Sequence, residues 1–211
     1  MISGFSSNKE LVESLIREGY IKSERVAKAF LEVDRKRFVW PGSEHLAYVD
    51  EPLALGDTGQ TISAPSMIAL MVEVMDLKKY ENVLEIGTGS GYSAAIISKL
   101  VYPGSVVTVE LNYKLYLFGR KNLKDYVNVI PVFADGSKGF PMGSKEEIYD
   151  KAVIMAASQK IPEDVLAQVK KGGFVVAPVG GRGYQDLIKK WKDGREENYG
   201  GCIFVPLRSL D

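Results

Sequence analysis

The stretch of residues 82–95, NVLEIGTGSGYSAA, constrains the fold of this chain more than any other. An apolar run at 83–86 leads into glycine at every second position, Gly87, Gly89 and Gly91, and a helix-compatible run follows. This order predicts a buried strand, a tight turn and a helix. Glycine suits such a turn because a Cβ would restrict both its backbone angles and the close approach of a ligand. The helix would offer unpaired N–H groups and the positive end of its dipole to that ligand.

The glycine spacing separates two classes of nucleotide site. Dinucleotide-binding turns carry G-x-G-x-x-G, whereas this chain has G-x-G-x-G with the acidic Glu85 two residues before the first glycine. The pattern resembles the first motif of class I S-adenosylmethionine-dependent methyltransferases, in which the loop cradles the methionine part of the cofactor. Two alternatives stay open at this point: a nicotinamide site, and a glycine-rich turn of a doubly wound sheet that holds no cofactor.

The length and composition of the chain limit its domain organisation and the functions open to it. The 211 residues suit a single domain, 1–211, with N-terminal helices and a loop in 1–77 and a sheet core in 82–211. Formal net charge is zero, so no global basic field would attract nucleic acid. One cysteine and one histidine exclude a disulfide within the chain and a Cys/His zinc cluster, so we expect no metal. No signal-peptide pattern and no run of membrane-spanning length occur, so we expect a cytoplasmic protein without a membrane partner.

The shortage of reactive side chains limits the chemistry further. The chain contains neither a G-x-S-x-G nucleophile elbow nor a G-x-x-x-x-G-K-[ST] phosphate loop. His45 lies in the loop 41–45, where an exposed or already satisfied histidine is expected. An enzyme with this sequence would therefore take its chemistry from a cofactor.

Two helices are predicted at the N-terminus. Ser7 and Glu10 have capping-box spacing ahead of an apolar stripe of Leu11, Leu15 and Ile16, and Gly19 ends that helix. Ser23 caps a second helix, whose buried face carries Val26, Ala29, Phe30 and Val33. The basic stretch 34–37 is interpreted as a solvated helix end, and 38–51 as an irregular connection. Residues 50–66 read as a loop, after which Pro65 would open a helix that is apolar on nearly every side, 67–77.

From Asn82 onward, strands and helices alternate. Because the strands are apolar throughout, they predict a doubly wound, mostly parallel α/β sheet covered on both faces. The predicted strands are Val83–Ile86, Val106–Glu110, Val129–Phe133, Ala152–Met155 and Phe174–Pro178, and the predicted helices are Ser93–Val101, Tyr113–Leu123 and Pro162–Lys170. Gly172 and Gly173 are expected to end the last helix, and Gln185–Lys192 with Cys202–Leu207 to form a closing antiparallel hairpin.

Acidic residues follow the strands at the edge where such sheets bind ligands. Glu110 closes the second strand and could accept two hydrogen bonds from a ribose diol. Asp135 follows the third strand and could accept a hydrogen bond from the exocyclic amine of adenine, while Gly136 would let the ring lie close.

Outside these shared motifs, the chain resembles the protein-L-isoaspartate (D-aspartate) O-methyltransferase family. The resemblance rests first on Gly59-Gln-Thr-Ile-Ser-Ala-Pro65, preceded by Asp50-Glu-Pro-Leu53 and Gly56. Later blocks that match in order are Ala156-Ala157, Ile161-Pro162, Val169–Gly173, Pro178–Gly180 and Phe204–Leu207. Ser158 departs from the pattern, because family members often have proline there.

The resemblance implies a fold, a reaction and a set of site residues. The fold would be the seven-stranded, Rossmann-like methyltransferase sheet, and the reaction would be methylation of the stray α-carboxylate of isoaspartyl residues, followed by closure to a succinimide. The implied catalytic residue is Ser63, with Ala64, Val205, Pro206 and Leu207 beside it in the substrate site. The implied cofactor-binding residues are Gln60, Thr61, Ile62, Glu85, Gly87, Thr88, Gly89, Ser90, Gly91, Glu110, Leu111, Asp135 and Gly136.

The expected partners are S-adenosyl-L-methionine and isoaspartyl-containing proteins and peptides, with no nucleic acid and a monomeric chain. Two rival functions share the fold. One is a methyltransferase acting on a small molecule or RNA, although the near-neutral charge disfavours RNA. The other is a noncatalytic protein that binds the cofactor.

Overall fold

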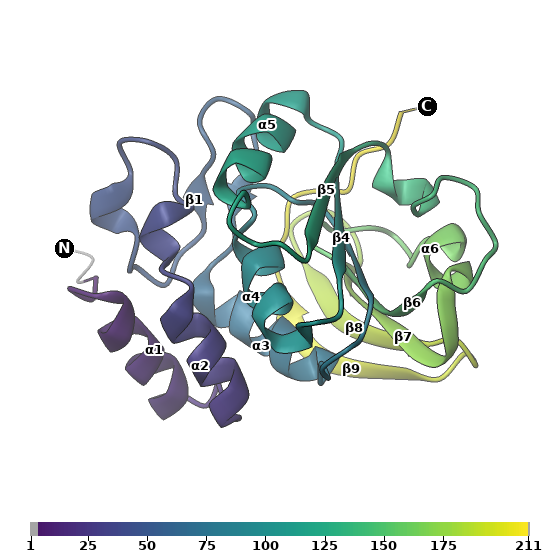
Figure 1. Ribbon diagram of the computed structural model, residues 1–211, viewed down its shortest axis with the longest axis horizontal. Helices are drawn as coiled ribbons and strands as arrows, with labels where there is room; N and C mark the ends of the chain where they lie inside the picture. Colours follow the sequence, from purple (N-terminus) through teal and green to yellow (C-terminus); the bar gives the residue numbers. More distant parts are fainter. Residues whose placement is uncertain (1–3, 211) are drawn as a thin grey trace.

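A seven-stranded sheet organises residues 4–210, the part of the chain that the computed structural model describes (Figure 1). Its strand order is β5-β4-β3-β6-β7-β8-β9. Strands β3 to β7 pair in parallel, and β8 and β9 are added antiparallel. The bounds are β3 Val83–Ile86, β4 Val106–Glu110, β5 Val129–Phe133, β6 Tyr149–Ile154, β7 Val169–Val179, β8 Gln185–Trp191 and β9 Glu196–Cys202. The predicted fold class is confirmed, and β8 and β9 follow β7 in sequence order at one edge of the sheet.

Helices cover the sheet on both faces, which is why β3 is buried along its whole length. Helices α3, α4 and α5 contribute to a hydrophobic core on one face, with α1 and α2 packed outside them (Figure 1). On the other face, a smaller core lies under α6. The bounds are α1 Asn8–Arg17, α2 Glu24–Glu32, α3 Pro65–Met75, α4 Tyr92–Val101, α5 Tyr113–Asn122 and α6 Glu163–Ala167. No helix within residues 4–210 is both long and apolar enough to span a bilayer.

Most predicted helix ends are confirmed. The hydroxyl groups of Ser7 and Ser23 accept hydrogen bonds from the first turns of α1 and α2, and Pro65 opens α3. Glu10 turns back to Ser6 rather than to Ser7, so only half of the predicted capping box forms. The stripe of α1 is also shifted, because Val12 is buried whereas Ile16 is 46% exposed.

Two predicted boundaries are wrong in the C-terminal half. Helix α6 ends at Ala167, and the segment containing Gly172 and Gly173 lies inside β7. A Cβ on Gly173 would stand 2.2 Å from the carbonyl oxygen of Asp150, so glycine here permits close pairing of β7 with β6. The second hairpin strand is the polar β9, not 202–207, which leaves the sheet.

The predicted loop 50–66 contains a small hairpin. Strands β1 (Leu53–Ala54) and β2 (Thr61–Ile62) pair antiparallel, and they hold the intervening turn beside the carboxyl edge of the large sheet. Three short 3₁₀ helices complete the fold: η1 Arg35–Arg37, η2 Glu44–Leu46 and η3 Gly136–Lys138.

A row of polar side chains runs through the buried centre of the sheet. Glu85 is fully buried, and its Oε2 accepts a hydrogen bond of 2.5 Å from the Thr108 hydroxyl, which lies 2.7 Å from the Thr88 hydroxyl. Its other oxygen, Oε1, has no partner among the described residues. Burial raises the pKa of Glu85 to about 7, the Glu110 carboxylate raises it further, and the hydroxyls of Ser93 and Thr108 oppose the rise.

Replacing Glu85 with glutamine should change how stability depends on pH. The folded-state pKa lies above the ordinary value of 4.5, so the stability that Glu85 contributes is complete below pH 4.5 and is lost as pH rises through 7. The loss corresponds to about 3 kcal/mol. Urea unfolding at pH 5 and pH 8 should therefore show wild type losing most, though not all, of this amount relative to Glu85→Gln. Glu13→Gln, on the surface of α1, is the matched control, and curves that stay parallel for wild type and Glu85→Gln would contradict the assignment.

Candidate functional site

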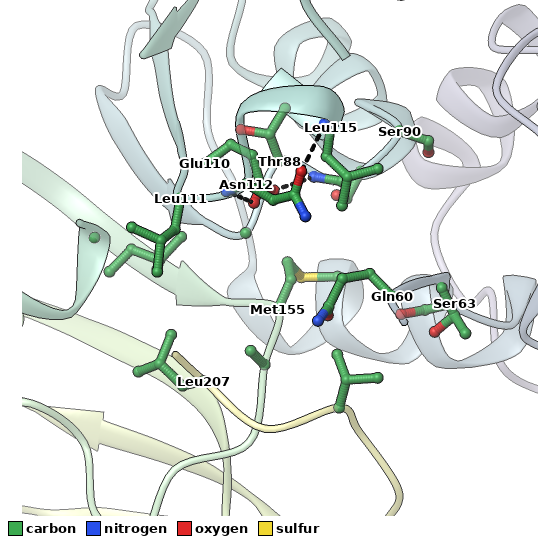
Figure 2. A pocket seen from close by; sticks show the side chains of 18 of the residues that line it. Gln60, Ser63, Thr88, Ser90, Glu110, Leu111, Asn112, Leu115, Met155 and Leu207 are labelled. Atoms are coloured by element: carbon green, nitrogen blue, oxygen red, sulfur yellow. Dashed lines mark hydrogen bonds between the residues drawn. The ribbon is translucent and has the colours of Figure 1, made fainter. Parts of the chain in front are cut away.

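A cavity of about 300 Å³ lies where the carboxyl ends of β3, β4 and β6 meet (Figure 2). This is the edge at which a doubly wound sheet binds ligands. The residues 60–63 and the C-terminal segment 205–208 close its other side. The lining residues are Gln60, Thr61, Ile62, Ser63, Ile68, Ile86, Gly87, Thr88, Gly89, Ser90, Tyr92, Ser93, Val109, Glu110, Leu111, Asn112, Leu115, Gly136, Met155, Ala156, Val205, Pro206, Leu207 and Arg208.

The three glycines give the turn after β3 a shape that other residues adopt with strain. Gly87, Gly89 and Gly91 have φ angles of 96°, 52° and 88°, all in the left-handed region. A Cβ on Gly87 would stand 3.4 Å from that of Met155, which follows the neighbouring strand β6. Gly91 does not line the cavity; its role is to begin α4 next to Leu123, whose side chain would lie 2.8 Å from an added Cβ.

Glu110 links the glycine turn to the end of β4. Its two carboxylate oxygens accept hydrogen bonds of 2.8 Å from the backbone nitrogens of Gly89 and Asn112. Burial raises its pKa, and the backbone donors partly oppose that rise. Each oxygen keeps a further lone pair, so a carboxylate facing the cavity can still accept hydrogen bonds from a diol. Figure 2 shows the side chain of Asn112 beside Glu110, with its oxygen bonded to the Leu115 nitrogen and its amide nitrogen turned toward the cavity.

Asp135 lies behind the cavity rather than on its wall. Its carboxylate accepts hydrogen bonds from the nitrogen and hydroxyl of Ser137, at 2.9 and 2.6 Å, and from the nitrogen of Leu210 at 2.8 Å. Burial opposes ionisation, but these bonds lower the pKa of Asp135 overall. Gly136 does line the cavity, and its missing side chain accommodates Ile86, whose Cγ2 would lie 2.6 Å from an added Cβ.

A buried arginine positions the segment that carries Ser63. The Arg35 guanidinium is 0% exposed and donates to the carbonyl oxygens of Ala47 (2.9 Å), Val49 (3.3 Å), Glu51 (3.0 Å) and Ser63 (3.0 Å). Burial lowers its pKa to about 10, and the Asp50 carboxylate opposes the shift; because about 10 is well above 7, the guanidinium stays charged at neutral pH. The prediction that 34–37 is a solvated helix end is wrong at this residue, although Lys36 and Arg37 are exposed.

Ser63 presents its side chain to the cavity. Within residues 4–210, its hydroxyl makes no hydrogen bond, whereas its carbonyl oxygen accepts one from Arg35. Figure 2 shows Ser63 and Gln60 on the opposite side of the cavity from Glu110 and Thr88. Ala64 is the N-cap of α3 and lies outside the lining.

The segment 205–207 is anchored on the end of β6. Ala157 donates from its nitrogen to the carbonyl of Val205 at 2.8 Å and accepts from the nitrogen of Leu207 at 2.7 Å. Ser158 follows on the same backbone but bonds to Pro178 and Gly180, away from the cavity. The end of β6 therefore supports one wall of the site through its backbone.

The structure brings together most of the residues that the sequence singled out, and it adds others. Glu85, Gly91, Ala64 and Asp135 stand behind the wall. Lining residues that the sequence did not single out are Ile68, Ile86, Tyr92, Ser93, Val109, Asn112, Leu115, Met155, Ala156 and Arg208. Several of these directly follow a predicted strand or predicted site segment, which is the signal that could have found them. Residues 4–210 contain no group of three or more His, Cys, Asp or Glu side chains arranged to hold a metal ion.

Comparison with known proteins identifies the family. The family described as protein-L-isoaspartate(D-aspartate) O-methyltransferase matches residues 6–211. A protein-L-isoaspartate O-methyltransferase of Methanopyrus kandleri is 46% identical over 209 residues, covering 95% of this chain and 91% of the relative. One of Pyrococcus horikoshii is 44% identical over 206 residues, covering 94% and 91%.

Solved structures agree with this. A protein-L-isoaspartate O-methyltransferase with 33% identity superposes with a TM-score of 0.79, covering 94% of this chain and 65% of that one. A Plasmodium falciparum chain, solved with S-adenosyl-L-homocysteine, has the same fold, with a TM-score of 0.86, 23% identity and coverage of 97% and 99%. This chain therefore belongs to the protein-L-isoaspartate(D-aspartate) O-methyltransferase family.

Proposed function

We propose that this protein transfers a methyl group from S-adenosyl-L-methionine to the free α-carboxylate of L-isoaspartyl residues in damaged proteins and peptides. The methyl ester would then close to a succinimide, which begins repair of the residue. The observation that carries the proposal is one cavity in which the glycine turn after β3 faces the unpartnered hydroxyl of Ser63. Family membership supplies the reaction class.

The residues of the cavity fit this cofactor. A volume of about 300 Å³ is at the lower end for small-molecule sites, and Gly87 and Gly89 line the cavity without side chains that would reduce it. Glu110 and Asn112 offer polar atoms for a ribose and a base, and Ile86, Val109 and Leu111 offer apolar surface. When bound, S-adenosyl-L-methionine supplies an activated methyl group on a sulfonium.

The protein's own residues need to position a nucleophile rather than to activate it. A substrate carboxyl with a pKa of about 4 is already ionised at neutral pH, so no general base is required. Ser63 donates a hydrogen bond that orients the carboxylate, and Arg35 fixes the backbone of Ser63 from behind. The segment 205–207 supports the substrate backbone. Positioning of this kind can contribute on the order of 7–11 kcal/mol.

Methyl transfer to a peptide tests the proposal directly. Radiolabel from S-adenosyl-L-methionine should appear on an isoaspartyl peptide and not on its normal aspartyl twin, and a D-aspartyl peptide is the second acceptor to assay. Label on RNA or on a small acceptor alone would move the activity to another substrate. Calorimetric binding of S-adenosyl-L-homocysteine without transfer to any acceptor would identify a noncatalytic protein. We propose that the active form is a monomer, which sedimentation of the assayed sample would check.

Replacing Ser63 with alanine should lower turnover and spare cofactor binding. A hydrogen bond to a charged group is worth about 1.5–3 kcal/mol, so we expect kcat to fall roughly 10- to 100-fold. Calorimetric affinity for S-adenosyl-L-homocysteine should stay within about 2-fold. Ser66→Ala, one turn along and outside the cavity, is the matched control. Unchanged turnover of Ser63→Ala on the isoaspartyl peptide would refute the role of the hydroxyl.

Replacing Glu110 with glutamine should weaken cofactor binding. A carboxamide has one acceptor oxygen for the two backbone nitrogens that Glu110 holds, and it also lacks the charge. We expect the affinity for S-adenosyl-L-homocysteine to fall by roughly 10- to 100-fold. Glu146→Gln, exposed and far from β4, should bind as wild type does. Equal affinity of Glu110→Gln and wild type would place the ribose elsewhere.

Arg35→Lys should separate positioning from cofactor binding. An ammonium has three donors and no fork, so it cannot hold four carbonyls as the guanidinium does. We expect kcat to fall about 10-fold while affinity for S-adenosyl-L-homocysteine changes by less than about 3-fold. Arg37→Lys, exposed and paired with Asp125, is the control. Parallel loss of turnover and cofactor affinity would show instead that Arg35 supports the fold in general.

A further inference from the structure

Arg208 is the basic residue among the side chains that line the cavity, as far as residues 4–210 show. The acidic residue of the lining, Glu110, lies on the wall formed by β4, and its oxygens already hold two backbone nitrogens. Arg208 belongs to the opposite wall and is exposed, so its guanidinium stands at the mouth of the cavity. The cavity therefore has a cation at its exposed edge, on the wall opposite Glu110.

The backbone on both sides of Arg208 is anchored. Leu207 donates to the carbonyl of Ala157 at 2.7 Å, and Leu210 donates to the carboxylate of Asp135 at 2.8 Å. The Arg208 Nη2 lies 3.9 Å from the place where a Cβ on Gly59 would stand, next to the predicted substrate loop. The guanidinium thus extends from the C-terminal segment to lie beside the β1–β2 turn.

No described residue pairs with this guanidinium. Within residues 4–210, the Arg208 side chain makes no ion pair or hydrogen bond. The carboxylates of Asp57 and Asp135 have other partners. Asp57 is paired with Lys114, and Asp135 holds Ser137 and Leu210. A planar fork of free N–H donors is matched to a carboxylate, which it can bind through two parallel hydrogen bonds.

We propose that Arg208 is a specificity residue that binds the side-chain carboxylate of an acidic residue flanking the methyl-accepting position of the peptide. The inference rests on the proposed function and names the substrate class that the site prefers. The reacting carboxylate is not the partner, because it must reach the hydroxyl of Ser63 inside the cavity. A bidentate bond from Arg208 would also hold both of its oxygens and stabilise it before reaction. The role is therefore in binding, with its effect on KM.

The test compares two isoaspartyl peptides that differ only in a glutamate or a glutamine next to the isoaspartyl residue. Wild type should have a KM for the glutamate peptide that is roughly 3- to 10-fold lower than for its glutamine twin, and Arg208→Gln should abolish that ratio. Arg208→Lys should restore part of it, because a point charge replaces the fork. The preference should also weaken between 50 and 300 mM salt, since an exposed pair is screened. Arg182→Gln, exposed in another loop, is the matched control.

Three results would overturn the proposal. Wild type could show no preference between the peptides, or Arg208→Gln could keep the wild-type ratio. Alternatively, Arg208→Gln could lose affinity for S-adenosyl-L-homocysteine, which would place the guanidinium on the cofactor. Peptide binding in the presence of S-adenosyl-L-homocysteine, measured by fluorescence anisotropy, separates this inference from the proposed function. Arg208-dependent binding of the glutamate peptide without methyl transfer would support the role of Arg208 and refute the proposed function. Binding of neither peptide would refute both.

Discussion

The parallel pairing of β3 with β4 on one side and β6 on the other is the contact on which the whole site depends. Ile86 lies in register with Val109 and with Ile154, so the three strands end together. The residues that follow them, Gly87, Glu110 and Met155, consequently converge on one cavity although they are far apart in the chain. Helices on both faces keep this strand edge buried on its sides and open only at its end.

Two buried ionisable groups, Arg35 and Glu85, hold the irregular segments of the site. Neither has an oppositely charged group as a hydrogen-bonded partner. Arg35 is held by carbonyl oxygens and Glu85 by the hydroxyl of Thr108. Burying a charge in this way is unfavourable. Burial therefore lowers the pKa of Arg35 and raises that of Glu85, and both shifts favour the neutral form. In return, each group orients a chain segment that has no regular structure of its own: the backbone at Ser63 in one case, and Thr88 of the glycine turn, through Thr108, in the other. Burying these two groups lowers the stability of the fold, and such destabilising features are expected at a functional site rather than in an ordinary core.

The sequence predicts the parallel core well because each central strand carries its own signal. Strands β3, β4 and β5 are mostly apolar or β-branched and end where predicted; β3 and β4 are largely buried, whereas the edge strand β5 is partly exposed. Edge strand β9 is different: six of its seven residues are exposed, so its polar composition matches a loop. The position of Arg35 was unpredictable for another reason. Its neighbours in sequence are charged and solvated, and the carbonyls that bury it come from residues 47–51 and 63, which only the tertiary fold brings near.

The chemistry that the family performs and the side chains that this chain provides are consistent with each other. The single histidine, His45, lies exposed in η2 and outside the cavity, so the site holds no imidazole that could take a proton. A carboxylate acceptor needs no such group, because it is already ionised at neutral pH. What the cavity offers is a hydroxyl donor, a fixed backbone and a cation at its mouth, and all three suit an acceptor that arrives already charged. The lining therefore agrees with the proposed carboxylate acceptor, whose nucleophile needs no proton removed before it reacts.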